Sequence, residues 1–165
     1  MHNTEYNENA QKNMSLLSKG AFLTTKDGDF VNTMTIGWGS IGVQWGKPVF
    51  TVMVRHSRKT YEMIEKTSDF TVTIPYCDVK SELSICGSKS GRDTDKIKEC
   101  GFKLAKSQCV ETPAIDIEGM HFECKILYKY SMDPSLLDKD VDDRWYSDKD
   151  YHTFYYGEIL NSYVK

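Results

Sequence analysis

The sequence has 165 residues, a length that suits one domain with its own hydrophobic core. Charged residues make up 27% and hydrophobic residues 39% of the chain, a balance typical of a soluble globular protein rather than a disordered one. The formal net charge is -3, so no basic excess indicates nucleic-acid binding. No apolar run reaches the roughly 20 residues that a membrane-spanning helix needs.

The N-terminus is polar and lacks the basic and then apolar pattern of a signal peptide. The number of cysteines is odd, and no two of them have C-x-x-C spacing. They are Cys77, Cys86, Cys100, Cys109 and Cys124. Reduced thiols in a cytoplasmic protein fit this pattern better than a disulfide framework, and the spacing predicts no metal site. We expect a single domain over residues 1–165, with residues 1–14 as a flexible N-terminal segment.

The first part of the chain predicts strands joined by tight turns. Residues 14–19 are expected to form a short helix or a lead-in segment, and residues 21–25 a strand. Residues 26–29 contain Asp-Gly, which supplies the positive φ of a tight hairpin. Residues 30–40 alternate and are rich in β-branched side chains, which predicts a second strand. Residues 48–54 are nearly all apolar, so a third strand is expected to be buried on both faces.

The rest of the chain mixes helical and strand patterns. Helices are expected over residues 57–66, with Ser57 as N-cap, and over residues 79–86 and 93–100, closed by Gly87 and Gly101. Strands are expected over residues 70–75, over residues 115–130 as one long strand or a bent pair, and over residues 151–163. The acidic stretch 138–150 is expected to be a solvated loop. Many strands with short helices between them indicate an all-β or α+β barrel.

The clearest candidate site follows the third strand. Behind Val54 come Arg55, Ser57, Arg58, Lys59 and Thr60, at the start of a helix. The first N–H groups of a helix lack intrahelical partners and the dipole is positive there, so helix N-termini bind anions. Two guanidiniums and two hydroxyls add donors suited to a phosphomonoester. The alternative is a capped helix with a solvated basic turn.

Two other segments could complete a site. Residues 32–38 form a strand edge that leads into a glycine-containing stretch, so a flat ring could lie against the backbone beside Asn32 and Trp38. Residues 86–96 form a loop with Gly, Ser and Lys that could close over a ligand. The alternatives are a plain core strand for the first segment and an exposed loop for the second.

An aromatic cluster over residues 151–156 is typical of a core or a subunit interface. It contains His152, which could titrate or contact a ligand. A structural histidine is the interpretation we favour. The sequence indicates no catalytic acid or base.

Taken in order, these segments resemble the flavin reductase-like family with the FMN-binding split-barrel fold, which includes the flavoredoxins. The matching stretches are residues 32–40, 54–60, 86–96 and 155–159, and the similarity covers roughly residues 15–163 in order and spacing. The resemblance implies a mainly β (α+β) fold, a closed six-stranded Greek-key barrel with short flanking helices. It also implies a homodimer with FMN near the subunit interface.

The resemblance implies three groups of flavin-binding residues. The phosphate would be held by Arg55, Ser57, Arg58 and Thr60. The isoalloxazine would be lined by Asn32, Met34, Thr35, Ile36 and Trp38. The phosphate or ribityl side would be closed by Ser88, Ser90, Gly91 and Lys96.

The implied function is that of a cytoplasmic FMN oxidoreductase that takes electrons from NADH or NADPH, with the hydride chemistry carried by the cofactor. One alternative is a flavoredoxin-like electron carrier that keeps its FMN and exchanges electrons with a protein partner. Another is a non-redox use of the same barrel. No separate nicotinamide fingerprint is present, so the choice between the two donors stays open.

Overall fold

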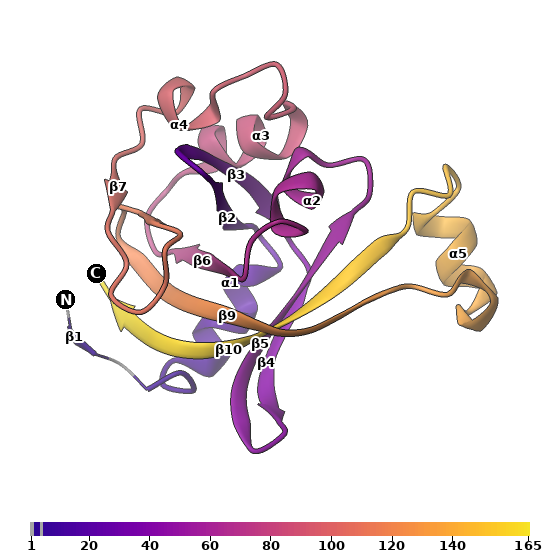
Figure 1. The fold of residues 1–165 in the computed structure, drawn as a ribbon, viewed down its shortest axis with the longest axis horizontal. Coiled ribbons are helices and arrows are strands. Elements are labelled where there is room, and N and C mark those ends of the chain that lie inside the picture. The colour runs from indigo at the N-terminus through magenta and orange to yellow at the C-terminus, as the bar shows by residue number, and fades with distance from the viewer. Residues whose placement is uncertain (1, 4) are drawn as a thin grey trace.

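The computed structural model describes residues 2–3 and 5–165, and its strands wrap around one core with helices at the rim (Figure 1). The longer strands are β2 (Ala21–Asp27), β3 (Phe30–Ile36), β4 (Gly39–Gln44), β5 (Lys47–Arg55), β6 (Asp69–Pro75), β9 (Gly119–Ser131) and β10 (His152–Val164). The short ones are β1 (His2–Asn3), β7 (Leu104–Ala105) and β8 (Ala114–Ile115). The helices are α1 (Ala10–Leu17), α2 (Lys59–Ile64), α3 (Lys80–Ser88), α4 (Lys96–Glu99), η1 (Pro134–Leu136) and α5 (Lys139–Trp145).

The main sheet has eight strands, paired antiparallel in the order β3-β2-β6-β9-β10-β5-β4, with β1 paired to β10. The split-barrel type of fold is confirmed, but the expected closed six-stranded barrel is wrong. Within the described residues the end strands β3 and β4 do not pair, so the barrel stays open along that seam.

The predicted strand over residues 30–40 is broken at Gly37 and Trp38, because the chain leaves β2 there and crosses to β5. Gly39 then begins β4 close against its neighbour. A Cβ at this position would lie 2.9 Å from the carbonyl oxygen of Thr51, which only glycine avoids. Glycine at position 39 therefore permits the close approach of β4 to β5 after this change of direction.

Two tight hairpins set the register of the sheet. Asp27 pairs with Phe30, and Gly28 between them has φ 59°, as the Asp-Gly pattern predicts. The β4–β5 hairpin turns at Trp45 and Gly46, with φ of 53° and 71°. Sequence reasoning missed this second turn because a bulky residue at positive φ is uncommon.

The core fills the inside of the sheet with side chains from all of its central strands. Leu23, Phe50, Val72, Phe122 and Tyr155 are fully buried. Burying a large apolar side chain stabilises the fold by about 1.5–3 kcal/mol each. The apolar run predicted as a strand buried on both faces is β5, most of which is buried.

Three of the predicted helices differ in detail. α2 begins at Lys59, and its N-cap is Arg58 without a side-chain cap, so Ser57 is not the N-cap. α3 continues through Gly87 to Ser88, and α4 is shortened to four residues. The glycine expected to close this last helix, Gly101, does follow it at φ 64°.

In the second half of the chain, one prediction is corrected and one pair of alternatives is decided. The acidic stretch contains a helix, α5, because Asp138 accepts hydrogen bonds from the N–H groups of Asp140 and Val141 as its N-cap. The strand predicted over residues 115–130 is a bent pair, β8 and β9. None of the helices that the structure describes is long and apolar enough to cross a membrane.

Candidate functional site

Two adjoining cavities lie beside β3. One, of about 160 Å³, is bounded by β3, the end of β5 and the start of β10, and we call it the strand cavity. The other, of about 110 Å³, lies between the start of α2 and the segment from Cys86 to Lys96, and we call it the basic cavity. Met34 and Arg58 line both, so the two cavities are direct neighbours.

All but one of the residues expected to bind a ligand line these cavities. The strand cavity is lined by Met34, Thr35, Ile36, Trp38, Arg55 and Arg58. The basic cavity is lined by Ser57, Arg58, Thr60, Ser88, Ser90, Gly91 and Lys96. The topology joins these segments because α3 packs on β3, where the Thr35 hydroxyl donates to the carbonyl of Leu83 over 2.7 Å.

The exception is Asn32, which is 3% exposed and lies beneath the basic cavity rather than on the wall of the strand cavity. Its Nδ2 donates to the Thr60 hydroxyl over 2.9 Å. Its Oδ1 lies against Gly91, where a Cβ would be only 2.2 Å away. Asn32 therefore joins β3, α2 and the loop in front of α4.

Lys96 gives the basic cavity a buried charge. Its side chain is 4% exposed, and its Nζ donates to the carbonyl of Cys86 over 3.2 Å. No carboxylate in the described part of the chain forms an ion pair with it, and burial lowers the pKa of this ammonium. A buried charge without a partner is unfavourable, so an anion in the basic cavity would be stabilised here.

Arg58 adds a second cation that no carboxylate of the described residues pairs with, where the two cavities meet. Among residues 2–3 and 5–165, its guanidinium has no hydrogen-bond or ion-pair partner. It is exposed and lies near enough to Lys96 to lower the pKa of that group further. The pair can bind an anion from two sides.

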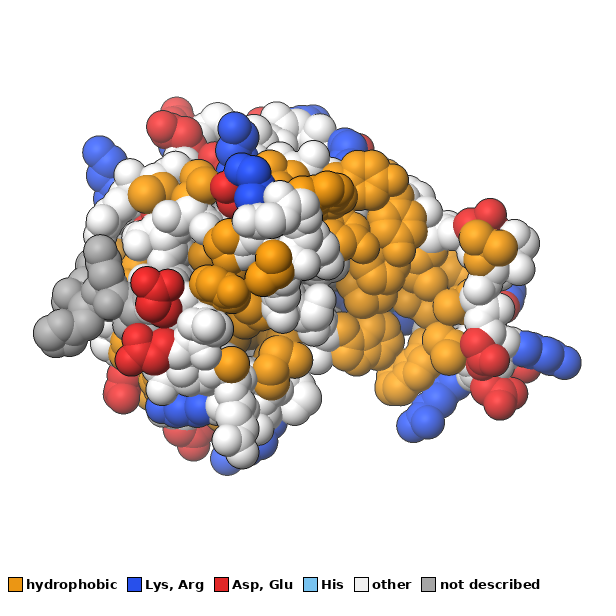
Figure 2. Space-filling model, turned by 90° about the horizontal axis from the view of Figure 1, so that it is seen from below, with side chains coloured by type: hydrophobic (Ala, Val, Ile, Leu, Met, Phe, Trp, Pro, Cys, Tyr) orange, Lys and Arg blue, Asp and Glu red, His pale blue; other side chains and the backbone are white. Residues whose placement is uncertain are grey.

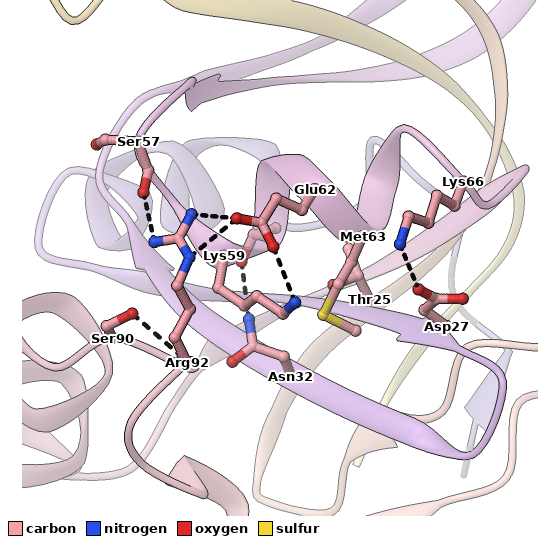
Figure 3. A network of polar contacts seen from close by, with 11 residues as sticks. Thr25, Asp27, Asn32, Ser57, Lys59, Glu62, Met63, Lys66, Ser90 and Arg92 are labelled. Carbon is pink, nitrogen blue, oxygen red and sulfur yellow. Dashed lines mark hydrogen bonds and ion pairs between the residues drawn. The ribbon is translucent and has the colours of Figure 1, made fainter.

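Glu62 binds two more cations beside the basic cavity, Lys59 and Arg92 (Figure 3). It accepts from Lys59 over 2.9 Å and from Nε of Arg92 over 2.9 Å. The hydrogen bonds of Lys59 and then of Arg92 lower its pKa to about 2. Arg92 also donates to the carbonyl of Ser57 over 2.9 Å, which ties the loop of residues 89–95 to the start of α2.

Arg55 forms hydrogen bonds with the segment that runs from the end of α5 to β10. Its guanidinium donates to the carbonyls of Trp145 over 2.6 Å and Asp150 over 3.0 Å, and to the Asp148 carboxylate over 3.2 Å. It lines the strand cavity but not the basic cavity, whereas the sequence placed it with the phosphate-binding group.

Ser57 is held by the same segment. Its N–H donates to the Asp150 carboxylate over 3.1 Å, and its hydroxyl donates to the other oxygen of that carboxylate. Asp150 therefore occupies two donors that an anion could use, and its charge opposes an anion at this end of the basic cavity.

His152 forms a wall of the strand cavity, although the sequence favoured a structural role for it over contact with a ligand. It is 7% exposed, and its Nδ1 lies 2.7 Å from the Tyr146 hydroxyl. Burial and, less strongly, the Arg55 charge lower its pKa to about 4, so the ring is neutral at pH 7. No local sequence signal identifies this role, because His152 is placed beside Arg55 by the pairing of β10 with β5.

Comparison with known proteins gives a consistent result. A family model described as "Flavin reductase like domain" matches residues 14–165. The chain spans about two thirds or less of the length of the curated relatives it matches, 66% of one and 51% of another.

Solved structures share the fold at low sequence identity. Flavoredoxin from Methanosarcina acetivorans has a TM-score of 0.70 at 24% identity, covering 88% of this chain and 68% of that one. An FMN-binding domain of a flavin reductases-like enzyme from Shewanella baltica has 0.67 at 18%, covering 93% and 73%. An NADH:FAD oxidoreductase from Streptomyces globisporus has 0.68 at 16%, covering 88% and 75%.

Proposed function

The chain belongs to the flavin reductase-like family, and on that premise we propose that it binds FMN across the strand and basic cavities and acts as an FMN oxidoreductase. The observation that carries this proposal is the buried ammonium of Lys96, which has no carboxylate partner in the described structure and borders a cavity that continues along β3. A monophosphate beside an apolar ring is the kind of ligand that this combination suits.

The residues present fit such a ligand. Lys96 and Arg58 supply charge for a phosphate, and the hydroxyls of Thr60 and Ser90 supply further donors. Met34, Ile36 and Trp38 supply an apolar and aromatic wall for the ring. Gly91 is required because any side chain there would press on Asn32. This assignment makes Asn32 and Arg55 positioning residues and gives Lys96 the main part in reading the phosphate.

FMN would supply hydride and single-electron transfer, which no side chain of the protein offers. The residues of the chain bind the phosphate, orient the ring and exclude water. His152 keeps a neutral imidazole on the wall of the strand cavity at pH 7, with Nδ1 held by Tyr146. It therefore adds no positive charge beside a reduced flavin.

We take NADH or NADPH as the electron donor, a role supported by the similarity to an NADH:FAD oxidoreductase. The test is an absorption spectrum of the purified protein followed by titration with each nucleotide. We expect a flavin spectrum, its bleaching by one of the nucleotides and turnover with added FMN. No flavin binding would exclude the proposal, whereas binding without turnover would exclude only the reductase activity.

A second candidate is an electron carrier that keeps its FMN, which the similarity to a flavoredoxin favours. The two candidates differ in how firmly FMN stays bound and in what reduces it. FMN that remains through gel filtration and is reduced faster by a redox protein than by either nucleotide would favour the carrier. Reduction only by NADH or NADPH would favour the enzyme.

We also propose that the protein is a homodimer with FMN near the subunit interface. Hydrophobic side chains gather in one broad patch where the arm that bears α5 leaves the body (Figure 2). Trp45, Tyr128 and Tyr130 are 63%, 51% and 40% exposed and are linked through ring contacts with Tyr156. Large exposed aromatic surfaces of this kind mark sites of protein association.

A further inference from the structure

Two cysteines border the basic cavity and touch one another. Cys86 lies in α3 and lines the cavity, and Cys100 is the C-cap of α4. Their sulfur atoms are 3.8 Å apart, and no other cysteine sulfurs are in contact in the part of the chain that the structure describes. A disulfide would require the sulfurs to approach by about 2 Å.

The segment between these cysteines carries the residues that close the basic cavity. It includes Ser88, Ser90, Gly91 and Lys96. The carbonyl of Cys86 also accepts the hydrogen bond from Lys96, and Lys96 is the first residue of the helix that Cys100 ends. A covalent link between the two sulfurs would close the chain into one ring around this segment.

We propose that Cys86 and Cys100 form a reversible disulfide that restrains the 89–95 loop and thereby regulates ligand binding in the basic cavity. The disulfide itself stands on the contact between the sulfurs, whereas its effect on FMN rests on the proposed function. A ring of this length reduces the number of conformations open to the loop. Less conformational entropy is then lost when a ligand orders the loop.

The oxidant is a peroxide, and Cys100 reacts first because it is partly exposed whereas Cys86 is 1% exposed. The Cys100 thiolate attacks hydrogen peroxide, which gives a sulfenic acid and releases hydroxide. The Cys86 thiol loses its proton and the resulting thiolate attacks that sulfur, so the S–S bond forms and the S–O bond breaks. The hydroxide that leaves takes up the proton and becomes water. Overall, two thiols lose two hydrogens and one peroxide becomes two waters. A dithiol reverses the change by exchange.

The environment makes this a slow reaction. Burial raises the pKa of the Cys86 thiol to about 12 and also raises the pKa of the Cys100 thiol. Few thiolates are therefore present near neutral pH, and the thiolate is the reactive form. We expect the link to form during sustained exposure to peroxide rather than in brief pulses.

The first test is chemical and needs no flavin. A variant with Cys77→Ser and Cys109→Ser removes the exposed thiols and keeps the contacting pair and the buried Cys124. The protein is treated with hydrogen peroxide and alkylated under denaturing conditions, and its mass and its peptides are measured. We expect Cys86 and Cys100 to escape alkylation, a mass lower by two hydrogens at this pair, and a peptide that joins Cys86 to Cys100. Adding Cys100→Ser should abolish both. Absence of the link, or a link to Cys124, would overturn the proposal.

The second test measures the restraint. Trypsin cleaves after Lys89 and Arg92 inside the loop, so its rate reports how freely the loop opens. We expect the oxidised protein to be cut there several-fold more slowly than the reduced protein, and a dithiol to restore the rate. An unchanged rate would show that the link leaves the loop free.

The last test compares FMN and riboflavin binding to the two forms by fluorescence quenching. We expect oxidation to tighten FMN binding by about threefold, through preorganisation of the loop, and to leave riboflavin binding unchanged. Unchanged or weaker FMN binding would overturn the regulatory effect. If FMN binds neither form, the proposed function fails, and the peptide and trypsin results still decide whether the disulfide exists.

Discussion

Lys96 places a positive charge in the protein interior that no carboxylate in the described structure neutralises. Its only hydrogen-bond acceptor there is the carbonyl of Cys86. An isolated buried charge lowers the stability of a folded protein, so a residue of this kind is expected where a ligand provides the opposite charge. Binding and stability should then respond to its removal in opposite directions.

We expect Lys96→Met to weaken FMN binding by about 1.5–3 kcal/mol, the scale of a lost charged hydrogen bond. The same change should leave riboflavin binding nearly unaltered, because riboflavin has no phosphate. It should also raise the free energy of unfolding of the ligand-free protein, since an unpaired buried charge is lost. Isothermal titration and urea unfolding measure the two effects.

The control is Lys98→Met, which removes an exposed lysine from the same helix. It should change neither quantity appreciably. Equal losses of FMN and riboflavin affinity in Lys96→Met would show that Lys96 does not read a phosphate.

His121 couples the stability of the barrel to pH. It is 1% exposed, its Nδ1 lies 3.1 Å from the Thr73 hydroxyl, and burial lowers its pKa from 6.5 to about 4. The unfolded chain accepts a proton below about pH 6.5, and the folded chain does so only near pH 4. Stability from the neutral ring is therefore present above pH 6.5 and lost as the pH falls toward 4.

We expect His121→Gln to reduce the loss of stability between pH 7 and pH 5 by about 2 kcal/mol, the amount that this shift supplies over that interval. Urea unfolding at the two pH values measures the difference. The comparison concerns the change with pH, so a lower stability of the variant at pH 7 does not affect it. The same pH dependence in both proteins would show that His121 is protonated while folded.

At the scale of elements, local sequence signals predicted most strands and the β2–β3 turn, because strand alternation and Asp-Gly act over a few residues. They failed where a contact with a distant segment decides the local structure. Ser57 is not the N-cap of α2 because Asp150, far along the chain, takes its hydroxyl hydrogen bond. The helix in the acidic stretch could have been predicted, since Asp138 is a local N-cap signal in the sequence.

The site shows the same limit. The order of the three segments predicted which residues line the two cavities, because the fold brings the segments together as units. The partners of single side chains could not be predicted. Arg55 turns to the carbonyls of Trp145 and Asp150, and Asn32 turns beneath the loop to Thr60. These contacts depend on the path of segments that have no sequence signal linking them.

A substitution at Gly91 tests how closely the 89–95 loop must approach β3. Gly91→Ala would place a methyl group 2.2 Å from Oδ1 of Asn32 and 3.3 Å from Cγ of Lys59. We expect the loop to move away from Asn32, with a loss of about 1–3 kcal/mol in stability and weaker FMN binding. Thermal unfolding and FMN titration measure both effects.

The matched control is Gly42→Ala, because a Cβ at Gly42 meets no atom within 4 Å and its backbone is not left-handed. This variant should keep the stability and the FMN affinity of the original protein. If Gly91→Ala also keeps both, the loop does not need to approach Asn32 for the site to form.

At the scale of the whole molecule, the barrel is open between β3 and β4, and the β4–β5 hairpin and the arm that bears α5 extend away from the body (Figure 1). The strand cavity lies beside this arm, since Trp38 lines the cavity and also contacts Trp145, at the end of α5, at 5.0 Å between ring centroids. The exposed Tyr130 stacks on Phe154, which shares a second cavity with Trp38. A second copy that covered the exposed aromatic residues would therefore also restrict access of water to the strand cavity.

We expect sedimentation to show a dimer that Trp45→Asn weakens by at least about tenfold, the effect of losing about 1.4 kcal/mol of apolar contact. Trp45 is 63% exposed at the tip of the β4–β5 hairpin, and asparagine accepts its positive φ, so the fold should remain. The control is Leu160→Asn. Leu160 is 41% exposed and lies near the C-terminal end of β10, so its replacement should leave the dimer intact. If Trp45→Asn loses the dimer and FMN together, the second subunit completes the flavin site, whereas a monomer that keeps FMN would place the whole site within one chain.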